Sequence, residues 1–496
     1  MRYLPTGKQM QMADFNTINN IGIPSLVLME RAALKTAEVM EKENIDLSNA
    51  VIFCGSGNNG GDGFAVARLL KEKGHKVTAV FVGKESSMSE GCKVQRDICL
   101  KIGVPVVTDT DKDNYTTVID SVFGVGLNRE IKGNYVDVIN KMNSMKGAKV
   151  AVDIPSGVCS ETGKILGVVF KADLTPTFQC EKIGMVMFPG HIYTGKTVVC
   201  HIGIDTSIYD DMNDVCFTYD VDDIKKLIPY RKPDTHKGSY GKVLMITGSE
   251  GMAGAAFLSA YSAYKCGAGL VHIYTAKENR VVLQTLLPEA IISTYTSFDE
   301  EEIIELLNWS DVTCIGCGLG TEETSDKILK CVLNNNNNPL VIDADGINML
   351  NNKMDIVNNS KYPVILTPHM MEMSRLTDIS VKDIKEDRFN IIDSFTTNNQ
   401  VVCALKDART VVSKEKKHYF VNTSGNNSMA KGGSGDVLAG IITALLAQGL
   451  DVFTAACLGV YIHGCSGDVA RNLHGEYSVI GRELAENVEC ILRDKE

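Results

Sequence analysis

The sequence lacks the features that mark several classes of protein. Its 496 residues carry 50 Lys and Arg against 61 Asp and Glu, a formal net charge of -11 at pH 7. Without a basic excess the chain has no general means of neutralising phosphates, so we expect neither nucleic acid nor an anionic membrane as partner. The first residues, MRYLPTGKQM, lack the apolar core of a signal peptide, and no apolar run approaches the length that spans a bilayer. We therefore expect a cytoplasmic location.

The cysteine spacing of secreted disulfide frameworks is also missing. The 15 Cys residues are scattered singly through both halves, and their number is odd. We expect most of them to be buried thiols. The one C-x-x-C, Cys314 to Cys317 in CIGCGLG, is compatible with a redox or zinc motif, but no second pair accompanies it. Because it lies where a strand runs into glycines, a turn is the favoured interpretation.

What the sequence does contain is a regular series of apolar runs, each ending in glycine or a polar residue. With 44% hydrophobic and 22% charged residues, the chain is long enough for more than one core. Strands that alternate with helical-length segments predict βαβ units and parallel sheets covered on both faces. The runs form two groups: 49–55, 76–83, 116–124 and 149–157, then 241–249, 311–320, 339–346, 362–369 and 399–407.

A polar, proline-bearing segment at 211–241 separates the two groups. We therefore predict two domains, 1–214 and 215–496, both of the α/β class and both built as three αβα layers. A helix is expected over 25–40, packed on the first sheet. In open parallel sheets ligands bind beyond the carboxyl ends of the strands, so each domain should gather its polar strand ends around one crevice.

The stretch GSGNNGGDG, residues 55–63, follows the first predicted strand and precedes the helix-like FAVARLL. Glycine weakens regular elements, so such a cluster serves a turn or a close backbone approach. A strand, a glycine loop and a helix start together present backbone N–H groups to an anionic oxygen, which predicts a phosphate or diphosphate ligand. The stretch matches neither G-x-x-x-x-G-K-[ST] nor G-x-G-x-x-G. A tight turn without a ligand remains the alternative.

Two strand ends in the first half carry acids, Asp120 and Asp153. A buried carboxylate is costly unless it pairs, binds a cation or transfers a proton. Asn59, Asp120 and Ser156 offer hard oxygen atoms suited to an alkali or alkaline-earth ion, which leaves Asp153 as the candidate acid or base. Alternatively, both acids cap helices or accept hydrogen bonds from loop amides.

Three motifs in the first half, NNGGDGFAVAR, DSVFGVGLNRE and AVDIPSGV, with the helix around LMERAA, resemble the NAD(P)H-hydrate epimerase domain, or YjeF N-terminal domain, over residues 1 to 210. The resemblance implies a Rossmann-like fold, potassium at Asn59, Asp120 and Ser156, and proton transfer by Asp153. Lys182 also fits the family pattern, but no chemical role is assigned to it. The implied hydrate contacts are Asn58, Asn59, Gly60, Gly61, Asp62, Gly124, Val125, Gly126, Leu127, Asn128, Arg129, Glu130 and Asp153.

The chemistry that this resemblance implies is an inversion at one ring carbon. The damaged nicotinamide ring carries a hydroxyl next to its nitrogen. Once protonated, the hydroxyl leaves as water while the nitrogen lone pair stabilises the cation. Water that returns on the other face gives the other epimer.

In the second half, KGGSGDVLAG at 431–440 places four glycines around Ser434 and Asp436 at a predicted helix start. The amides of Gly433, Ser434 and Gly435 can hold a transferring phosphoryl group while the Asp436 carboxylate accepts a hydroxyl proton, as in kinase-type chemistry.

Other strand ends of the second half carry polar residues too. The KDART segment, 406–410, adds a Lys and an Arg suited to nucleotide phosphates, with an exposed basic turn as the alternative. His369 lies at another strand end and is either catalytic or structural. Asp343 and Asp345 could bind a metal or cap a helix, and capping is favoured for Asp345.

Six strings in order, GSEGMAGAA, GCGLG, IDADGIN, TPHMMEMSRL, KDART and GGSGDVLAG, resemble the ADP-dependent NAD(P)H-hydrate dehydratase of the ribokinase-like superfamily, from about 220 to 490. The resemblance implies that Asp436 deprotonates the ring hydroxyl, that the nucleotide phosphorylates it and that phosphate then leaves. The expected cofactors are ADP or, alternatively, ATP, with K⁺ and Mg²⁺. The implied hydrate contacts are Ala255, Gly320, His369 and Asp436, and the implied nucleotide contacts are Lys406, Asp407, Ala408, Arg409, Thr410 and Gly435.

The chain departs from the second family's pattern at three positions. Met370 and Met371 stand where the family usually has Pro-Gly, and Ser428 stands where it usually has Gly. Because proline and glycine fix loop shape, these loops could differ from those of the family.

Taken together, the two resemblances predict a bifunctional NAD(P)H-hydrate repair enzyme acting on NADHX and NADPHX, and we expect a homo-oligomer. One alternative is a ribokinase-like kinase of a hydroxymethylpyrimidine or pyridoxal type of alcohol, fused to a non-catalytic nucleotide-binding scaffold. A dehydratase releases inorganic phosphate and restores the dihydronicotinamide, whereas a kinase leaves a stable phosphorylated alcohol.

Overall fold

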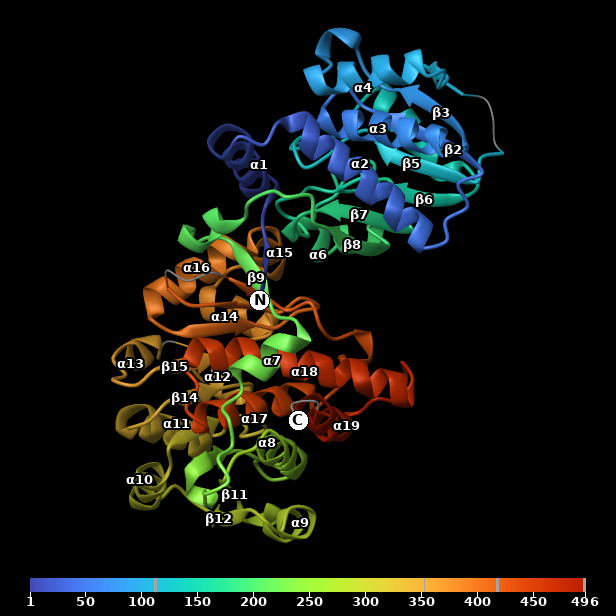
Figure 1. Cartoon of the computed structure of the whole chain (residues 1–496). Helices are drawn as coiled ribbons and strands as arrows, with labels where there is room; N and C mark the ends of the chain where they lie inside the picture. Colours follow the sequence, from blue (N-terminus) through green and yellow to red (C-terminus); the bar gives the residue numbers. More distant parts are fainter. Residues whose placement is uncertain (111–113, 352, 416–418, 494–496) are drawn as a thin grey trace. The chain divides into compact units, whose positions relative to one another are not determined.

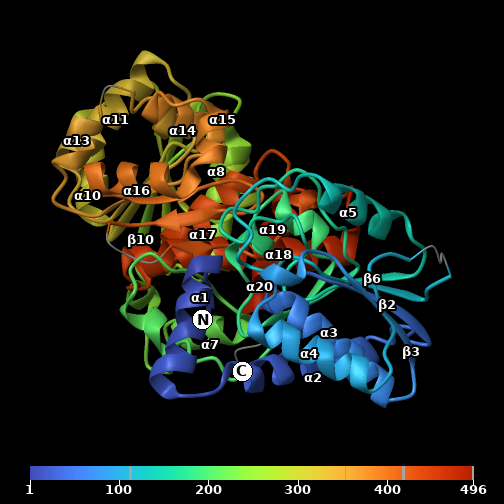
Figure 2. The ribbon, with the colours of Figure 1, turned by 90° about the horizontal axis from the view of Figure 1, so that it is seen from above.

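The computed structural model describes residues 1–110, 114–351, 353–415 and 419–493, and the chain divides into two compact units (Figures 1 and 2). The first unit is Arg2–Cys216, and the second comprises Met1 with Phe217–Glu496. Each unit has its own sheet and its own helical layers. The predicted fold class, two α/β units with parallel sheets, is confirmed.

The first unit is built on a parallel seven-stranded sheet in the order β4-β3-β2-β5-β6-β7-β8. The chain runs outward from β2 to β4, then returns and runs the other way from β5 to β8. The order therefore reverses between β2 and β5, which is where a doubly wound sheet opens a crevice for ligands. The seven strands of this sheet are β2 (Asn49–Cys54), β3 (Lys76–Phe81), β4 (Val106–Val107), β5 (Thr117–Ser121), β6 (Ala148–Ala151), β7 (Leu174–Phe178) and β8 (Lys196–Cys200), and a short strand outside it, β1 (Arg2–Leu4), precedes them in the chain.

Helices cover both faces of this sheet. Alternate residues of β2 belong to different cores, with Ile52 on the side of α2, α3 and α4 and Phe53 on the side of α5, and Figure 2 shows α5 on the opposite side of the strands from α2, α3 and α4. The α-helices are α1 (Gly7–Asn16), α2 (Ser25–Lys42), α3 (Asn58–Glu72), α4 (Glu90–Lys101), α5 (Asn134–Ser144) and α6 (Ile183–Val186). The short turns are the π-helix η1 (Thr17–Ile21) and the 3-10 helices η2 (Glu85–Ser87), η3 (Gly190–Tyr193) and η4 (Ser207–Asp211).

The sheet of the second unit has the order β9-β18-β17-β16-β15-β14-β13-β10-β11-β12. Strands β10 to β16 are parallel, whereas β17 is antiparallel to both of its neighbours. The order reverses between β10 and β13, so this unit also has a switch point. The strands are β9 (Cys216–Thr218), β10 (Lys242–Ile246), β11 (Leu270–Ala276), β12 (Ile291–Tyr295), β13 (Val312–Ile315), β14 (Leu340–Ile342), β15 (Val364–Leu366), β16 (Val402–Leu405), β17 (Val411–Ser413) and β18 (Phe420–Val421).

Figure 1 shows α10, α11, α13 and α16 along one side of this sheet and α8, α17, α18 and α19 along the other. The helices are α7 (Val221–Leu227), α8 (Ala253–Lys265), α9 (Arg280–Leu286), α10 (Glu300–Trp309), α11 (Glu323–Asn335), α12 (Asp345–Asn348), α13 (Met354–Asn358), α14 (Met370–Thr377), α15 (Val381–Glu386), α16 (Arg388–Asn399), α17 (Ser434–Ala447), α18 (Val452–His474), α19 (Gly481–Glu486) and α20 (Val488–Arg493). The 3-10 helices are η5 (Lys237–Tyr240), η6 (Lys277–Asn279) and η7 (Asn427–Met429).

Helix α18 is the one described helix that is long and apolar enough to cross a membrane, a property that the sequence analysis did not predict. Of its most apolar window, 72% is buried inside the protein. Its neighbours are α17, α19 and α20. Such burial is what a helix in the interior of its unit requires.

Candidate functional sites

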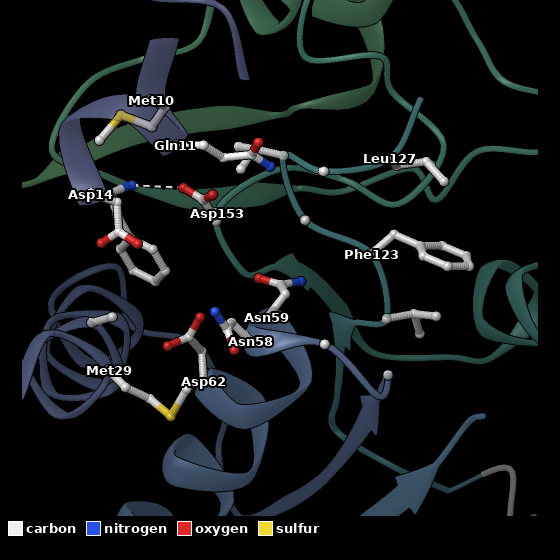
Figure 3. A pocket seen from close by; sticks show the side chains of 18 of the residues that line it. Met10, Gln11, Asp14, Met29, Asn58, Asn59, Asp62, Phe123, Leu127 and Asp153 are labelled. Atoms are coloured by element: carbon white, nitrogen blue, oxygen red, sulfur yellow. Dashed lines mark hydrogen bonds between the residues drawn. The ribbon is translucent and has the colours of Figure 1, made fainter. Parts of the chain in front are cut away.

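The first unit has a cavity of about 530 Å³ beyond the carboxyl ends of β2 and β5, at the switch point of its sheet (Figure 3). It is lined by the loop after β2, the start of α3, the loop after β5 and residues from α1 and α2. Among the residues implied by the resemblance, those that line it are Asn58, Asn59, Asp62, Gly124, Val125, Gly126, Leu127, Asn128, Arg129 and Asp153.

The glycines before and within α3 let its first turn sit against the end of β2. A Cβ at Gly60 would lie 1.9 Å from the carbonyl oxygen of Gly55, and a Cβ at Gly55 would lie 2.0 Å from that of Val122. No side chain fits at either position. Gly60 and Gly61 are buried against the protein and do not line the cavity, which leaves the other face of the turn for Asn58, Asn59 and Asp62.

Glu130 is not brought into this cavity. Its side chain is 60% exposed and pairs with Lys132 at 3.0 Å. The structure therefore separates Glu130 from the rest of the 124–130 segment.

Asp120 and Ser156 lie in direct contact beneath the cavity. Oδ1 of Asp120 accepts hydrogen bonds from Ser156 Oγ at 2.7 Å and Val122 N at 3.1 Å, and Oδ2 accepts from Ser156 N at 2.7 Å. Burial raises the pKa of Asp120 to about 6, although these hydrogen bonds act to lower it. Asn59 reaches the same strand end, since its carbonyl oxygen accepts from the Ser121 hydroxyl. The structure thus joins Asp120 to Ser156 directly, and Asn59 contacts Ser121, the next residue of β5, through its backbone.

Asp153 is held in a left-handed backbone conformation, with φ at 69°, by a buried network. Its Oδ1 accepts hydrogen bonds from Phe178 N at 2.9 Å, Thr177 Oγ1 at 3.3 Å and the Lys182 ammonium group. Lys182 is fully buried and also donates to Thr177 Oγ1 at 2.9 Å and to the Phe178 carbonyl oxygen at 3.1 Å. Asp153 therefore forms a buried ion pair at the wall of the cavity.

Helix α1 supplies cavity residues that no sequence motif indicated. Met10, Gln11 and Asp14 of α1 line the cavity, and burial together with Asp153 raises the pKa of Asp14. The pattern Thr6-x-x-Gln9 forms a reciprocal capping box at the start of α1 and could have predicted the helix, though not its position over the cavity.

In the second unit, Asp343 and Lys406 form an ion pair between the ends of β14 and β16. Lys406 Nζ lies 2.6 Å from Asp343 Oδ1, which also accepts from Thr367 Oγ1 at 2.7 Å. Cys317 Sγ donates to the other oxygen of Asp343 at 3.7 Å. Four strand ends of this sheet therefore meet around one carboxylate.

Asp436 lies in the first turn of α17, beside that pair. The ligand atoms of Cys317, Asp343 and Asp436 all lie within 4.8 Å of one another. Burial, and then the Asp343 carboxylate, raise the pKa of Asp436 to about 6. A Cβ at Gly435 would lie 3.5 Å from Lys406 Nζ, an ordinary van der Waals contact, so the lysine lies beside the start of the helix. The structure brings Asp436 and Lys406 together.

His369 caps α14, with its Nδ1 accepting from the backbone N–H groups of Met371 and Glu372 at 3.1 and 3.2 Å. Its side chain is 49% exposed, and burial with Lys406 and Arg375 lowers its pKa. Glu372 is buried behind it, which raises the pKa of that carboxyl to about 7. His369 reaches the same sheet edge as Lys406 through a parallel bridge.

The other residues implied as nucleotide contacts, at 407–410, differ in exposure and in their partners. Asp407 and Ala408 are exposed, and Asp407 pairs with Arg388. Arg409 is buried and donates to the Thr423 carbonyl oxygen at 3.2 Å, and Thr410 donates to the Asp407 carbonyl oxygen at 3.4 Å. Part of this segment thus holds the protein together, whereas Lys406 faces Asp343.

The implied hydrate contacts at the other switch-point strands lie in the loop after β13 and at the start of α8. Gly320 N donates to Asp345 Oδ2 at 2.9 Å, so Asp345 holds this loop. A Cβ at Gly318 would lie 2.7 Å from that of Ala255, so the loop packs on the start of α8. Cys314 and Cys317 are free, buried thiols, as are most of the 15 Cys residues.

Two doubly wound α/β units, each with a lysine-carboxylate pair at the carboxyl ends of its strands, define a two-domain enzyme. Comparison with known proteins identifies the family. Residues 25–184 match the family model of the YjeF-related protein N-terminus, and residues 243–489 match that of NAD(P)H-hydrate dehydratase.

Full-length relatives show the same combination. The chain is 33% identical to the bifunctional NAD(P)H-hydrate repair enzyme Nnr of Moorella thermoacetica, covering 100% of this chain and 97% of that one. It is also 33% identical to the Escherichia coli protein of the same name, covering 95% and 90%. The chain belongs to the family of bifunctional NAD(P)H-hydrate repair enzymes.

Solved structures match the second unit. The ADP/ATP-dependent NAD(P)H-hydrate dehydratase of Bacillus subtilis, co-crystallised with ATP and Mg²⁺, is 27% identical with a TM-score of 0.51, covering 56% of this chain and 98% of that chain. A ribokinase-like superfamily protein of Enterococcus faecalis is 29% identical with a TM-score of 0.51, covering 56% and 96%. The ribokinase-like prediction is confirmed.

Proposed function

We propose that this chain repairs hydrated NADH and NADPH: the first unit interconverts the R and S epimers of NAD(P)HX, and the second dehydrates the S epimer. The observation that carries the proposal is the match of both family models and of full-length relatives in one chain. Epimerisation supplies the form that dehydration consumes, so a single chain can restore both.

In the first unit we assign the hydrate to the 530 Å³ cavity and the proton transfer to Asp153. The first turn of α3 and the loop at 124–129 supply the binding walls, with amide side chains at Asn58, Asn59 and Asn128. The position of Asp153 supports this role, because its carboxyl group contacts Lys182 and also lines the cavity. A carboxylate there can accept the proton of water that adds to the ring cation.

Potassium fits the residues named for it. Asp120 and Ser156 present oxygen atoms at the end of β5, and a hard monovalent cation prefers such ligands. The Asn59 side-chain nitrogen is buried without a hydrogen-bond partner among the described residues, so it is a donor available to an acceptor atom of the substrate and not a ligand of the cation. When bound, K⁺ supplies positive charge beside a carboxyl group that burial otherwise makes costly to ionise.

In the second unit we assign the hydroxyl proton to Asp436 and the phosphate contacts to Lys406 and the 433–435 amides. The Asp436 carboxylate accepts the proton, and the amides at the start of α17 face the transferring group. Lys406 lies next to Gly435 and so brings positive charge to this point. The bound nucleotide, ADP or ATP with Mg²⁺, supplies the phosphoryl group that makes the hydroxyl a leaving group. We assign the remaining contacts to Ala255, Gly320 and His369.

The decisive experiment incubates the full chain with both hydrate epimers and ADP or ATP while the absorbance of the reduced nicotinamide is followed. Complete recovery is expected, with inorganic phosphate released in equal amount. Recovery that stops at the S fraction would contradict the epimerase assignment. A stable phosphorylated alcohol without recovery would instead establish the kinase alternative.

The chain's acidic net charge of -11 favours a small-molecule substrate over nucleic acid or an anionic membrane. We further propose a cytoplasmic homo-oligomer. Light scattering on the eluted protein measures the assembly, and a monomer at micromolar concentration would contradict it.

A further inference from the structure

The cavity of the first unit contains more ionisable side chains than hydrate binding needs. Asp14 from α1, Asp62 from α3 and Asp153 after β6 all line it, together with Lys182. Figure 3 shows Asp62 and Asp153 on facing sides of the open space, with Asp14 at its edge. Two cationic side chains, Arg129 and Lys182, line the same cavity as these three carboxyl groups.

Lys182 forms an ion pair with only one of the three carboxyl groups among the described residues. Lys182 is fully buried and pairs with Asp153, with no ion pair to Asp14 or Asp62 among the described residues. Oδ1 of Asp153 accepts three hydrogen bonds, whereas Oδ2 accepts none from the described residues. One oxygen of Asp153 is therefore fixed by hydrogen bonds, and the other is available to exchange a proton with the substrate or water.

Asp62, unlike Asp153, has neither an ion pair nor a hydrogen bond to its carboxyl group among the described residues. Its carboxyl group accepts no side-chain or backbone hydrogen bond from the described residues, and apolar side chains such as Met29 and Ile202 line the same cavity. Burial, and then the charges of Asp153 and Asp14, raise the pKa of Asp62 well above its ordinary value, against a smaller opposing effect of Lys182. The surroundings of Asp62 therefore favour the protonated form of its carboxyl group.

The proposed epimerisation needs two carboxyl groups on facing sides of the ring, one that gives a proton and one that accepts a proton. The ring hydroxyl leaves only if it receives a proton, and the incoming water must lose one. We propose that Asp62 is the general acid that protonates the departing hydroxyl, while Asp153 deprotonates the water that adds to the other face. This inference rests on the epimerase function proposed above.

The step balances in atoms and charge. The C–O bond breaks, the hydroxyl takes the Asp62 proton and departs as water, and the ring nitrogen lone pair stabilises the cation. A second water forms the new C–O bond and gives its proton to Asp153 Oδ2. Asp62 ends as a carboxylate and Asp153 as an acid, and proton exchange with water in the open cavity resets both. In the reverse direction the two residues exchange roles.

Asp14 is a positioning residue in this scheme. Its charge is one of the two that favour the protonated form of Asp62, and it also faces Asp153. Removing that charge makes Asp62 lose its proton more readily. The basic limb of the epimerase pH profile, where the acid is lost, should then move to lower pH.

The test uses the full chain with Asp62→Asn, which keeps the shape but not the transferable proton. We expect the kcat of epimerisation to fall about 100-fold or more, with KM for the hydrate within about threefold. Asp62→Glu, which keeps a proton donor, should recover part of the rate. Dehydration of the S epimer by the same protein serves as the control for folding and should be unchanged.

The pH profile separates an acid from a residue that only shapes the cavity. Asp14→Asn should move the basic limb to lower pH, and Asp62→Asn should abolish it. An Asp62→Asn protein with kcat within threefold of the parent, or a basic limb that neither variant moves, overturns the inference. If the unaltered chain itself inverts no epimer above the uncatalysed rate, the proposed function fails instead.

Discussion

The two sites use the same pair of side chains in different places. In the first unit the buried lysine, Lys182, pairs with Asp153, the residue assigned to proton transfer. In the second unit Lys406 pairs with Asp343, the neighbour of the proposed base, and Asp436 is left beside them with a pKa raised to about 6. The difference lies in which carboxylate the cation neutralises.

The chemistry explains the difference. Water that adds to a ring cation loses its proton easily, so a weak base such as an ion-paired carboxylate suffices. A neutral hydroxyl must be deprotonated as it attacks phosphorus, and a base is stronger when its pKa is higher. Placing the cation on Asp343 lets Asp436 be the stronger base. The site thereby gains basicity without losing the positive charge that a phosphoryl group requires.

The largest expected effect separates the two sites outright. Asp436→Asn should lower the dehydration kcat by roughly 10² to 10⁴, because the neighbouring Asp343 carboxylate is already paired with Lys406. Epimerisation should be unchanged. Both rates are measured on one preparation, with Asp153→Asn as the reciprocal variant. Loss of both activities in either variant would show that the sites are coupled.

The next effect compares the two lysines through stability. Lys182→Met leaves Asp153 buried without its cation and should cost about 3 kcal/mol of unfolding free energy, since breaking a buried pair exposes the full cost of the remaining charge. Lys406→Met should cost less because its side chain is 20% exposed whereas that of Lys182 is 0% exposed. Amide hydrogen exchange in β7 and β14 measures each unit separately. Equal costs would break the comparison.

A smaller effect concerns the raised pKa of Asp436. Asp343→Asn removes a charge that raises it and releases Lys406, which lowers it, so both changes bring the pKa of Asp436 below 6. The acid limb of the dehydration profile should move to lower pH, and the plateau rate should fall because the base is weaker. Asp345→Asn is the matched control, with a shift of the same sign but smaller. An acid limb that moves upward would contradict this account.

The smallest effect concerns the loop in which the chain departs from its family. Ser428 donates through its hydroxyl and its backbone N–H to Asn426 Oδ1, at 2.5 and 3.0 Å. Ser428→Gly keeps the backbone bond, so the KM for ADP should change by less than about threefold. A tenfold change would show that the serine sets the shape of the nucleotide site.

The recurring apolar runs made the parallel sheets predictable. Several strands could not be predicted, because their sequences are too short or contain a residue unfavourable to a strand. Strand β7 contains Pro176, which argues against a strand because it lacks an N–H donor. It is tolerated because β6 pairs with β7 only at Val150 and Leu174, so Pro176 lies beyond that ladder. Strands β9, β17 and β18 have two or three residues each, too few to show a period.

Site residues that end predicted strands were found, because the carboxyl edge of a parallel sheet collects them. Asp120, Asp153, Asp343, His369 and Lys406 are of this kind. Asp14 was missed because it lies on a helix before the first strand of the sheet, and nothing local places that helix over the cavity. Lys182 carried no chemical assignment because its role depends on contact with Asp153, 29 positions earlier in the chain.

The buried cysteines allow the opening rate of each unit to be measured by thiol labelling. The thiols are free, and all but Cys180, Cys465 and Cys490 are buried. An alkylating reagent can reach a buried thiol only when the surrounding structure opens, so its rate of labelling reports that opening. The labelling rates of Cys54 in β2 and Cys403 in β16, measured on their separate peptides, would therefore report the opening of the two sheets independently. No engineered probe is needed.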